Sequence, residues 1–265
     1  MLVLTAPAKT LDESTPYSLS FNARAPRLLG KAEQIATLLK SYDLAKFRKT
    51  LAISDKLAAP NFERYQHWDA AQHQEPTARP ALFCYDGDIY EKMEPYKYTP
   101  SMQLYAEKSV RILSGLYGVL SGFELMLPYR LEMKQKLPEL LPEFKSLAEF
   151  WRDAVTDLLN ADLAETPQDT ACLVVNLASE EYAAAVDFSR INAPVLKIDF
   201  FTSDHKGRKR MVPLHSKHAR GLMLDFMIKN EVKKPGKLLD FQAGGYKLTD
   251  QQEHYLAFTR SAGTN

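Results

Sequence analysis

Two mainly apolar segments, residues 171–176 and 195–200, constrain the fold of this chain most strongly. Side chains branched at Cβ, such as those of valine and isoleucine, pack well on the pleated surface of a sheet. Both segments therefore predict central strands of a sheet. Shorter apolar runs predict further strands at residues 2–4, 81–85, 110–113, 131–133, 211–214 and 255–258.

Helical periodicity fills much of the sequence between these runs. Apolar residues recur at steps of three and four over residues 28–39 and 147–163, as on the buried face of an amphipathic helix. We predict further helices at residues 45–51, after a capping Ser54, after Pro100 and over 215–230. No repeat or low-complexity linker divides the chain. The predicted fold class is α+β: one mixed α/β domain over residues 1–265, with central strands flanked by helices.

The composition supports a globular protein without a membrane partner. Hydrophobic residues make up 45% of the 265 and charged residues 25%, which excludes a wholly disordered or fibrous chain. No stretch approaches the roughly 18 to 20 apolar residues that a membrane helix needs, and the first residues lack a basic leader. We therefore expect a cytoplasmic location.

The cysteines and histidines indicate neither a disulfide framework nor a metal site. Cys84 and Cys172 lie in apolar, strand-like runs, so we expect reduced, buried thiols. His215 and His218 could share a metal on one helix, but no third ligand follows at a telling spacing. We predict no metal and no cofactor.

Positive charge is concentrated in one part of the chain. The net charge is only +1, yet residues 205–237 contain ten Lys or Arg and two acids, a formal charge of +8, which leaves −7 for the rest. Such a surface suits a polyanion, because each neutralised phosphate releases counterions. A solvated hairpin and helix that balances acidic surface elsewhere is the alternative. The candidate contacts in this segment are Arg208, Lys209, Arg210, Lys217 and Arg220.

Two glycines, Gly115 and Gly118, bracket Leu116 and Tyr117 in an otherwise apolar segment. Glycine lets a backbone approach a ligand closely, and exposed amides can hold a phosphate. The segment is similar to the hairpin of helix-hairpin-helix DNA-binding motifs, although two residues separate the glycines instead of one. A tight structural turn between two core elements explains the spacing equally well.

Charged side chains at predicted element ends suggest an alternative function. Sites form at such positions, so an enzyme acting on a nucleotide, nucleoside or nucleic-acid base is the rival interpretation. However, the chain has no Walker loop, no dinucleotide-binding glycine motif and no hydrolase or metalloprotease motif. Arg130 and Glu132 would share one strand face and could form a structural ion pair. The candidate catalytic residues are Lys9, Asp55, Asp88 and Glu181.

Seven strings spread over nearly the whole chain resemble the YaaA family, and they occur in the family's order. They are PAKTL at 7–11, ISDKLA at 53–58, GDIY at 87–90, LSGLYGVL at 113–120, PYRLEM at 128–133, NLAS at 176–179 and ARGLM at 219–223. Ala6 stands where the family commonly has serine, so no hydroxyl role is carried over to that position.

The resemblance implies a cytosolic protein of the peroxide-stress response that limits free iron and iron-driven damage to DNA. It also implies a family-specific mixed α/β fold, a helix-hairpin-helix-like element at residues 113–120, and a positive cleft that binds duplex or branched DNA without reading its sequence. We infer no protein partner. An iron-sequestering protein is a third interpretation, for which the sequence offers no iron site. The cleft residues implied by the matching strings are Lys9, Lys56, Arg130, Lys217 and Arg220.

Overall fold

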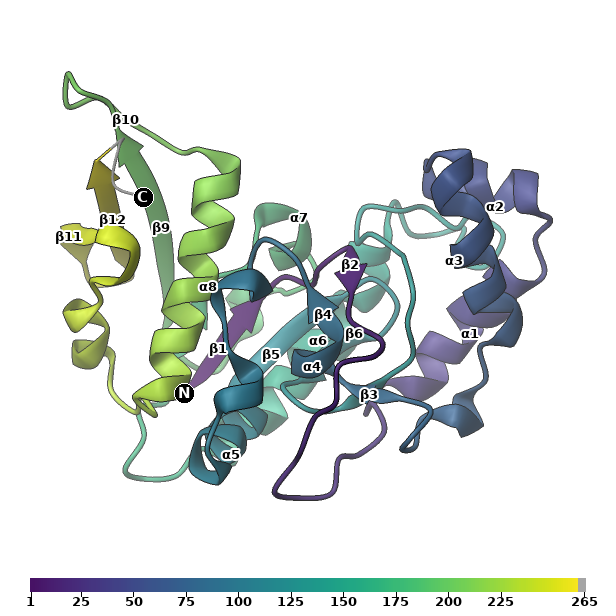
Figure 1. The fold of residues 1–265 in the computed structure, drawn as a ribbon, viewed down its shortest axis with the longest axis horizontal. Helices are drawn as coiled ribbons and strands as arrows, with labels where there is room; N and C mark the ends of the chain where they lie inside the picture. Colours follow the sequence, from purple (N-terminus) through teal and green to yellow (C-terminus); the bar gives the residue numbers. More distant parts are fainter. Residues whose placement is uncertain (262–265) are drawn as a thin grey trace.

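A mostly parallel sheet forms the centre of the protein, in a computed structural model that describes residues 1–261 (Figure 1). Its strand order is β11 (Lys247–Gln252), β12 (Tyr255–Ser261), β9 (Val195–Ser203), β8 (Val174–Asn176), β1 (Leu2–Thr5), β5 (Val110–Ser114) and β6 (Gly118–Ser121), with β10 (Lys209–Arg210) paired to β9. The predicted mixed α/β fold with central strands is confirmed.

The direction of the strands determines where the loops gather. β1 runs parallel to both β5 and β8, and β9 runs parallel to both β8 and β12. The carboxyl ends of these five strands therefore point to the same side, which we call the carboxyl edge. In open parallel sheets this is the side where ligands bind.

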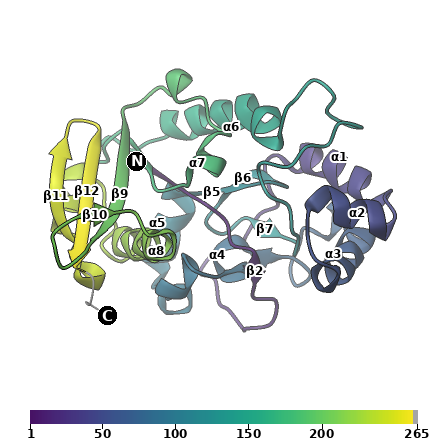
Figure 2. The same ribbon diagram turned by 90° about the horizontal axis from the view of Figure 1, so that it is seen from above.

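Helices cover both faces of the sheet. Figure 2 shows α6 on one face and α5 with α8 on the other, while α1, α2 and α3 form a separate group at one end of the molecule. The bounds are α1 (Leu29–Lys40), α2 (Leu44–Leu51), α3 (Asp55–His67), α4 (Ala81–Cys84), α5 (Pro100–Ser109), α6 (Leu147–Ala164), α7 (Glu180–Ala183) and α8 (Pro213–Lys229). The helices predicted at 28–39, 45–51 and 147–163 are confirmed. Ser54 does precede α3, but its side chain makes no capping hydrogen bond.

Short elements connect these parts. Two small antiparallel pairs join β2 (Thr10–Leu11) to β4 (Tyr85–Asp86) and β3 (Arg79–Pro80) to β7 (Leu125–Met126). Single 3-10 turns lie at Ala70–Gln72, Tyr90–Lys92, Pro95–Lys97, Phe188–Arg190, Pro235–Asp240 and Ala243–Gly245. The first pair ties the loop after β1 to the segment after α4.

Three predicted strands are wrong. Residues 81–84 form the buried helix α4, because a short continuous apolar run fits a buried helix as well as a buried strand. Leu131 and Met133 are buried and Glu132 is half-buried, and the three residues form no strand. At 211–214, β10 has already ended at Arg210 and α8 begins at Pro213, since proline suits the first turn of a helix.

The two cysteines differ in exposure. Cys84 is buried, as predicted, whereas Cys172 is exposed. The prediction for Cys172 fails because β8 begins only at Val174, two residues further along the chain.

Candidate nucleic-acid interface

Loops that are distant in the sequence leave the sheet together at the carboxyl edge. Lys9 follows β1, and Arg208 to Arg210 follow β9. Helix α8 returns from that edge, so Lys217 and Arg220 in its first turns also lie near it (Figure 1). The strand directions thus bring cations from separate parts of the chain to one side of the molecule.

The carboxylate of Glu132 holds Lys9 and two further cations, Arg130 and Lys134. Lys9 Nζ lies 2.6 Å from Glu132 Oε1, Lys134 Nζ lies 2.8 Å from Glu132 Oε2, and an Arg130 amine nitrogen lies 3.9 Å from Oε1. Burial alone raises the pKa of Glu132, but hydrogen bonds from Lys134 and Lys9 lower it below its ordinary value. Glu132 is therefore ionised at neutral pH, and the four side chains together carry a charge of +2.

Lys217 connects α8 to the loop that carries Lys9. Its Nζ lies 2.6 Å from Asp88 Oδ2. The preceding Gly87 packs close to that loop, because a Cβ added there would meet the Ala8 Cβ at 3.4 Å. The ion pair between Lys217 and Asp88 therefore lies beside the segment that leads to Lys9.

Arg220 lies half-buried, one turn after Ser216 on α8. The carboxylates whose charges act on it are Asp199 and Glu180, and its Nε is buried without a hydrogen-bond partner. Arg220 therefore faces the segment after β8, which contains Glu180.

The hairpin formed by β9 and β10, which we call the basic hairpin, carries exposed charge. Arg208 Nε lies 2.8 Å from Asp204 Oδ2. Lys209 and Arg210 are exposed, and neither takes part in an ion pair within residues 1–261. Figure 1 shows this hairpin standing clear of the rest of the molecule at its upper left. Its two unpaired cations remain available to an anion.

Lys56 does not join the other predicted cations. It is exposed in the first turn of α3, at the opposite end of the molecule from the basic hairpin (Figure 1). Both ends rise toward the same side, on which β2 and α7 lie between them. Lys56 could reach only a ligand long enough to span the molecule.

The glycine segment is a buried turn between strands β5 and β6, so a helix-hairpin-helix-like element is not confirmed there. Leu116 and Tyr117 are fully buried. A Cβ on Gly115 would lie 2.4 Å from the Leu131 carbonyl oxygen, and one on Gly118, whose φ is +70°, would lie 2.6 Å from the Trp151 ring. Close packing accounts for both glycines, and the turn presents none of these residues to solvent.

A buried network of hydrogen-bonded hydroxyls holds Tyr129, the residue before Arg130. The Tyr129 hydroxyl lies 2.9 Å from that of Tyr85 and 2.6 Å from Ser114 Oγ. Burial raises the pKa of Tyr129 to about 12, so it stays neutral at physiological pH. The network fixes the start of the segment that leads to Glu132.

Three of the four predicted catalytic residues lie at the carboxyl edge. Asp88 pairs with Lys217 beside the segment that leads to Lys9. Glu181, in α7 after β8, lies on the same edge, and its Oε1 is buried without a hydrogen-bond partner among residues 1–261. Asp55 is separate, because it is exposed on α3 and pairs with Arg48 at 2.8 Å.

The two histidines are engaged separately. His215 Nδ1 lies 3.0 Å from Thr202 Oγ1, and His218 Nε2 lies 3.8 Å from Glu91. Among the residues that the structure describes, no three His, Cys, Asp or Glu side chains are grouped so as to hold a metal ion. Nor does any helix within residues 1–261 have the length and apolarity needed to span a membrane.

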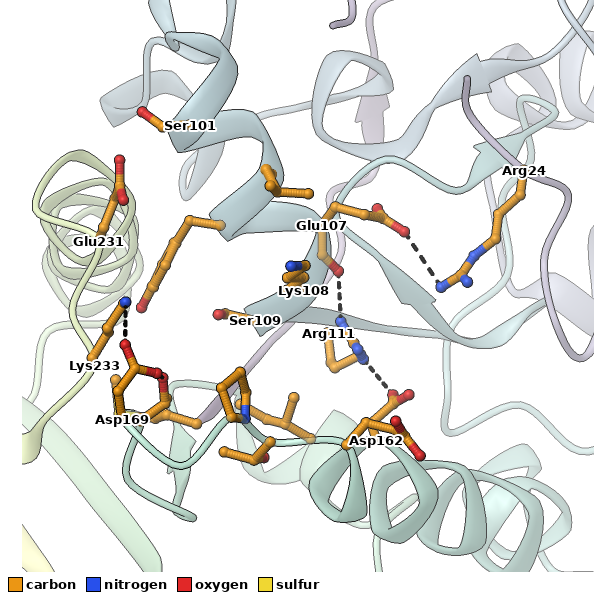
Figure 3. A pocket seen from close by; sticks show the side chains of 18 residues that line it. Arg24, Ser101, Glu107, Lys108, Ser109, Arg111, Asp162, Asp169, Glu231 and Lys233 are labelled. Atoms are coloured by element: carbon orange, nitrogen blue, oxygen red, sulfur yellow. Dashed lines mark hydrogen bonds and ion pairs between the residues drawn. The ribbon is translucent and has the colours of Figure 1, made fainter. Parts of the chain in front are cut away.

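A pocket of about 640 Å³ lies at the opposite side, beside the amino end of β1 (Figure 3). Two ion pairs hold part of its charge: Arg111 with Asp162 at 2.6 Å, and Lys233 with Asp169 at 2.6 Å. Because acidic side chains outnumber basic ones in its lining, the pocket offers less to an anion than the carboxyl edge does.

Some residues of the carboxyl edge were not predicted from sequence. Lys134 belongs to none of the motifs, and only its contact with Glu132 marks it. The hydroxyls of Thr5 and Ser216 are buried and have no hydrogen-bond partner in the part of the chain that the structure describes, which no sequence pattern reveals.

Comparison with known proteins gives one consistent result. A family model described as peroxide stress protein YaaA matches residues 1–252. The chain is 36% identical to a UPF0246 protein of Idiomarina loihiensis, over 98% of this chain and 99% of that protein. It is 37% identical to UPF0246 proteins of Marinomonas sp., over 95% and 93% of the two chains, and of Hahella chejuensis, over 98% and 99%. The chain therefore belongs to the YaaA family of peroxide stress proteins.

Proposed function

We propose that this chain is a cytosolic peroxide-stress protein that binds duplex or branched DNA along the carboxyl edge. It contacts the phosphate backbone without reading sequence. The observation that carries the proposal is the meeting of cations from separate segments, Lys9, Arg130 and the basic hairpin, on the side where parallel strands end.

The charge left after internal pairing sets the expected strength. The group around Glu132 retains a charge of +2, and Lys209 and Arg210 add two unpaired cations. If four phosphates are neutralised, a plot of log affinity against log salt has a slope of about −3.6, at roughly −0.9 per phosphate. DNA binding by this edge is therefore strongly salt-dependent.

The same physics connects DNA binding to protection from iron. Protein cations release the counterions condensed on DNA, and ferrous iron is one such counterion. Bound protein thereby lowers the amount of iron that can react with peroxide beside the DNA. Ferrous iron and hydrogen peroxide should nick a supercoiled plasmid more slowly when the protein is present.

Reversing the charges of the basic hairpin tests the interface. We expect the variant Arg208→Glu, Lys209→Glu, Arg210→Glu to lose most of its affinity for a labelled duplex in a fluorescence-anisotropy titration. Lys233→Glu, at the pocket on the opposite side, is the matched control and should bind normally. Unchanged affinity in the folded triple variant would remove the basic hairpin from the interface.

A second candidate function is an enzyme that acts on a nucleotide, nucleoside or nucleic-acid base. It is favoured by five buried polar atoms near the carboxyl edge that have no hydrogen-bond partner among residues 1–261, since leaving such groups unpaired costs free energy. They are Thr5 Oγ1, Arg130 Nε, Glu181 Oε1, Ser216 Oγ and Arg220 Nε. Donors and acceptors are both present, as recognition of a base requires.

Calorimetric titration with free nucleotides and bases tests this second function. Salt-insensitive binding of one such compound, together with turnover that Lys9→Ala abolishes, would favour the enzyme over backbone binding. No heat with any of these compounds would count against it.

A further inference from the structure

The segment that joins the basic hairpin to α8 exposes two large apolar side chains. Met211 is 45% exposed and Leu214 is 49% exposed. They lie on either side of Val212 and Pro213, directly after the cations Lys209 and Arg210. Apolar side chains scattered singly on a surface are ordinary, but two within four residues beside unpaired cations form a distinct feature.

This apolar pair is held in a defined shape. Arg210 is paired to Thr202 of the sheet, which fixes the start of the segment. Pro213 begins α8, and the Ser216 amide donates a hydrogen bond to the Val212 carbonyl at 2.9 Å, which fixes its end. A side chain presented from such a segment loses little backbone freedom when it inserts into a partner.

We propose that Met211 and Leu214 form an apolar wedge that enters between neighbouring base pairs of DNA held by Lys209 and Arg210. The inference rests on the proposed function, because it assumes that DNA lies on the carboxyl edge. DNA-bending proteins insert side chains of this kind, methionine and leucine among them, and thereby unstack a base step and kink the duplex.

Charge complementarity selects DNA as the occupant. Within residues 1–261 neither cation before the wedge lies within ion-pairing distance of a carboxylate, although the charge of Arg210 acts on Asp204, so both match a phosphate backbone on either side of an opened step. A wedge also makes the protein prefer DNA structures in which base stacking is already weakened. Mismatches, junctions and flexible pyrimidine–purine steps already have weakened stacking, so opening them costs less than opening a regular duplex.

The test compares binding with unstacking. We would measure the affinity of the full chain for a matched duplex and for the same duplex with one central mismatch, each with 2-aminopurine beside the centre. The variant is Met211→Gln, Leu214→Gln, and both positions are exposed, so folding should persist. Leu104→Gln, equally exposed at 46% but in the pocket on the opposite side, is the control.

We expect wild type and the control to bind the mismatched duplex about tenfold more tightly and to raise 2-aminopurine fluorescence on both duplexes. The double variant should lose both effects and keep a salt-dependent affinity for the matched duplex. If the double variant behaves as wild type, the wedge is wrong while DNA binding stands. If wild type binds neither duplex, the proposed function is wrong, and the wedge is then wrong as well.

Two further results would reassign these side chains. In one, wild type sediments with vesicles of anionic lipid, the double variant does not, and the two proteins give the same 2-aminopurine signal; Met211 and Leu214 would then be a membrane contact. In the other, wild type self-associates, the double variant does not, and the 2-aminopurine signal is again the same; the two side chains would then be a contact between copies of the chain. Either result overturns the wedge.

Discussion

Replacing Glu132 by glutamine should strengthen DNA binding, although it removes a group from the interface itself. Glu132 holds Lys9, Lys134 and Arg130 within 4 Å, and its negative charge cancels one of their three positive charges. Glutamine keeps the shape and removes the charge. One more phosphate can then be neutralised, which steepens the salt slope by about 0.9. The gain in affinity should accordingly be about eightfold larger at 0.1 M salt than at 1 M.

The same substitution should cost the fold little. The lysine side chains in the two short pairs are 60% and 62% exposed, and such pairs stabilise a protein by roughly 0.2–1 kcal/mol each. Asp169→Asn is the control, because Asp169 also accepts from a lysine at 2.6 Å but lies beside the pocket on the opposite side. Anisotropy titrations at several salt concentrations measure both slopes. Equal slopes for wild type and Glu132→Gln would refute a DNA site at Glu132.

Three other predictions concern the fold. Gly118→Ala should lower the free energy of unfolding, measured by urea denaturation, by about 2–4 kcal/mol, because the added Cβ meets the Trp151 indole at a residue with positive φ. Gly207 also has positive φ but lies in open space, so Gly207→Ala should lower the free energy of unfolding by only about 1–2 kcal/mol. Cys172 should react at once with a thiol reagent in the native protein, and Cys84 only on unfolding, because burial raises its pKa to about 12. Burial alone raises the pKa of Asp162, but Arg27 and Arg111 hold it below the ordinary value of 3.8. The ionised carboxylate therefore stabilises the fold above pH 3.8, and this stabilisation is lost as the pH falls through the lower pKa of the folded state. Asp162→Asn should therefore weaken the acid sensitivity of urea unfolding, and an unchanged pH profile would contradict this.

Apolar patterns predicted the centre of the fold because at least one face of each element there packs into the core. Residues 195–200 lie within β9, and the helix predicted at 147–163 is α6. The same signal failed at residues 81–84, where a buried helix turn has the composition of a strand.

The candidate site was harder to predict, because sequence reveals charge but not its partners. Lys9 and Arg130 do meet, yet through Glu132, which lowers the charge that they offer. The spacing of Gly115 and Gly118 suggests a ligand contact. In the structure both positions require glycine because Leu131 and Trp151, on other segments, leave no room for a Cβ, and no local sequence pattern contains that information. Lys56 matches a family string but lies on a separate group of helices.

The position of β1 in the sheet has a consequence for how the chain is made. Val3 pairs with Val110 on one side and with Val175 on the other. During synthesis on the ribosome, β1 has no neighbouring strand until β5, near the middle of the chain, has emerged. Its other edge stays unpaired until β8, about two-thirds along the chain, has emerged. Pairing over such separations is slow and leaves strand edges exposed to aggregation. The chain therefore acquires its central structure late in synthesis, and holding chaperones should matter most in that interval.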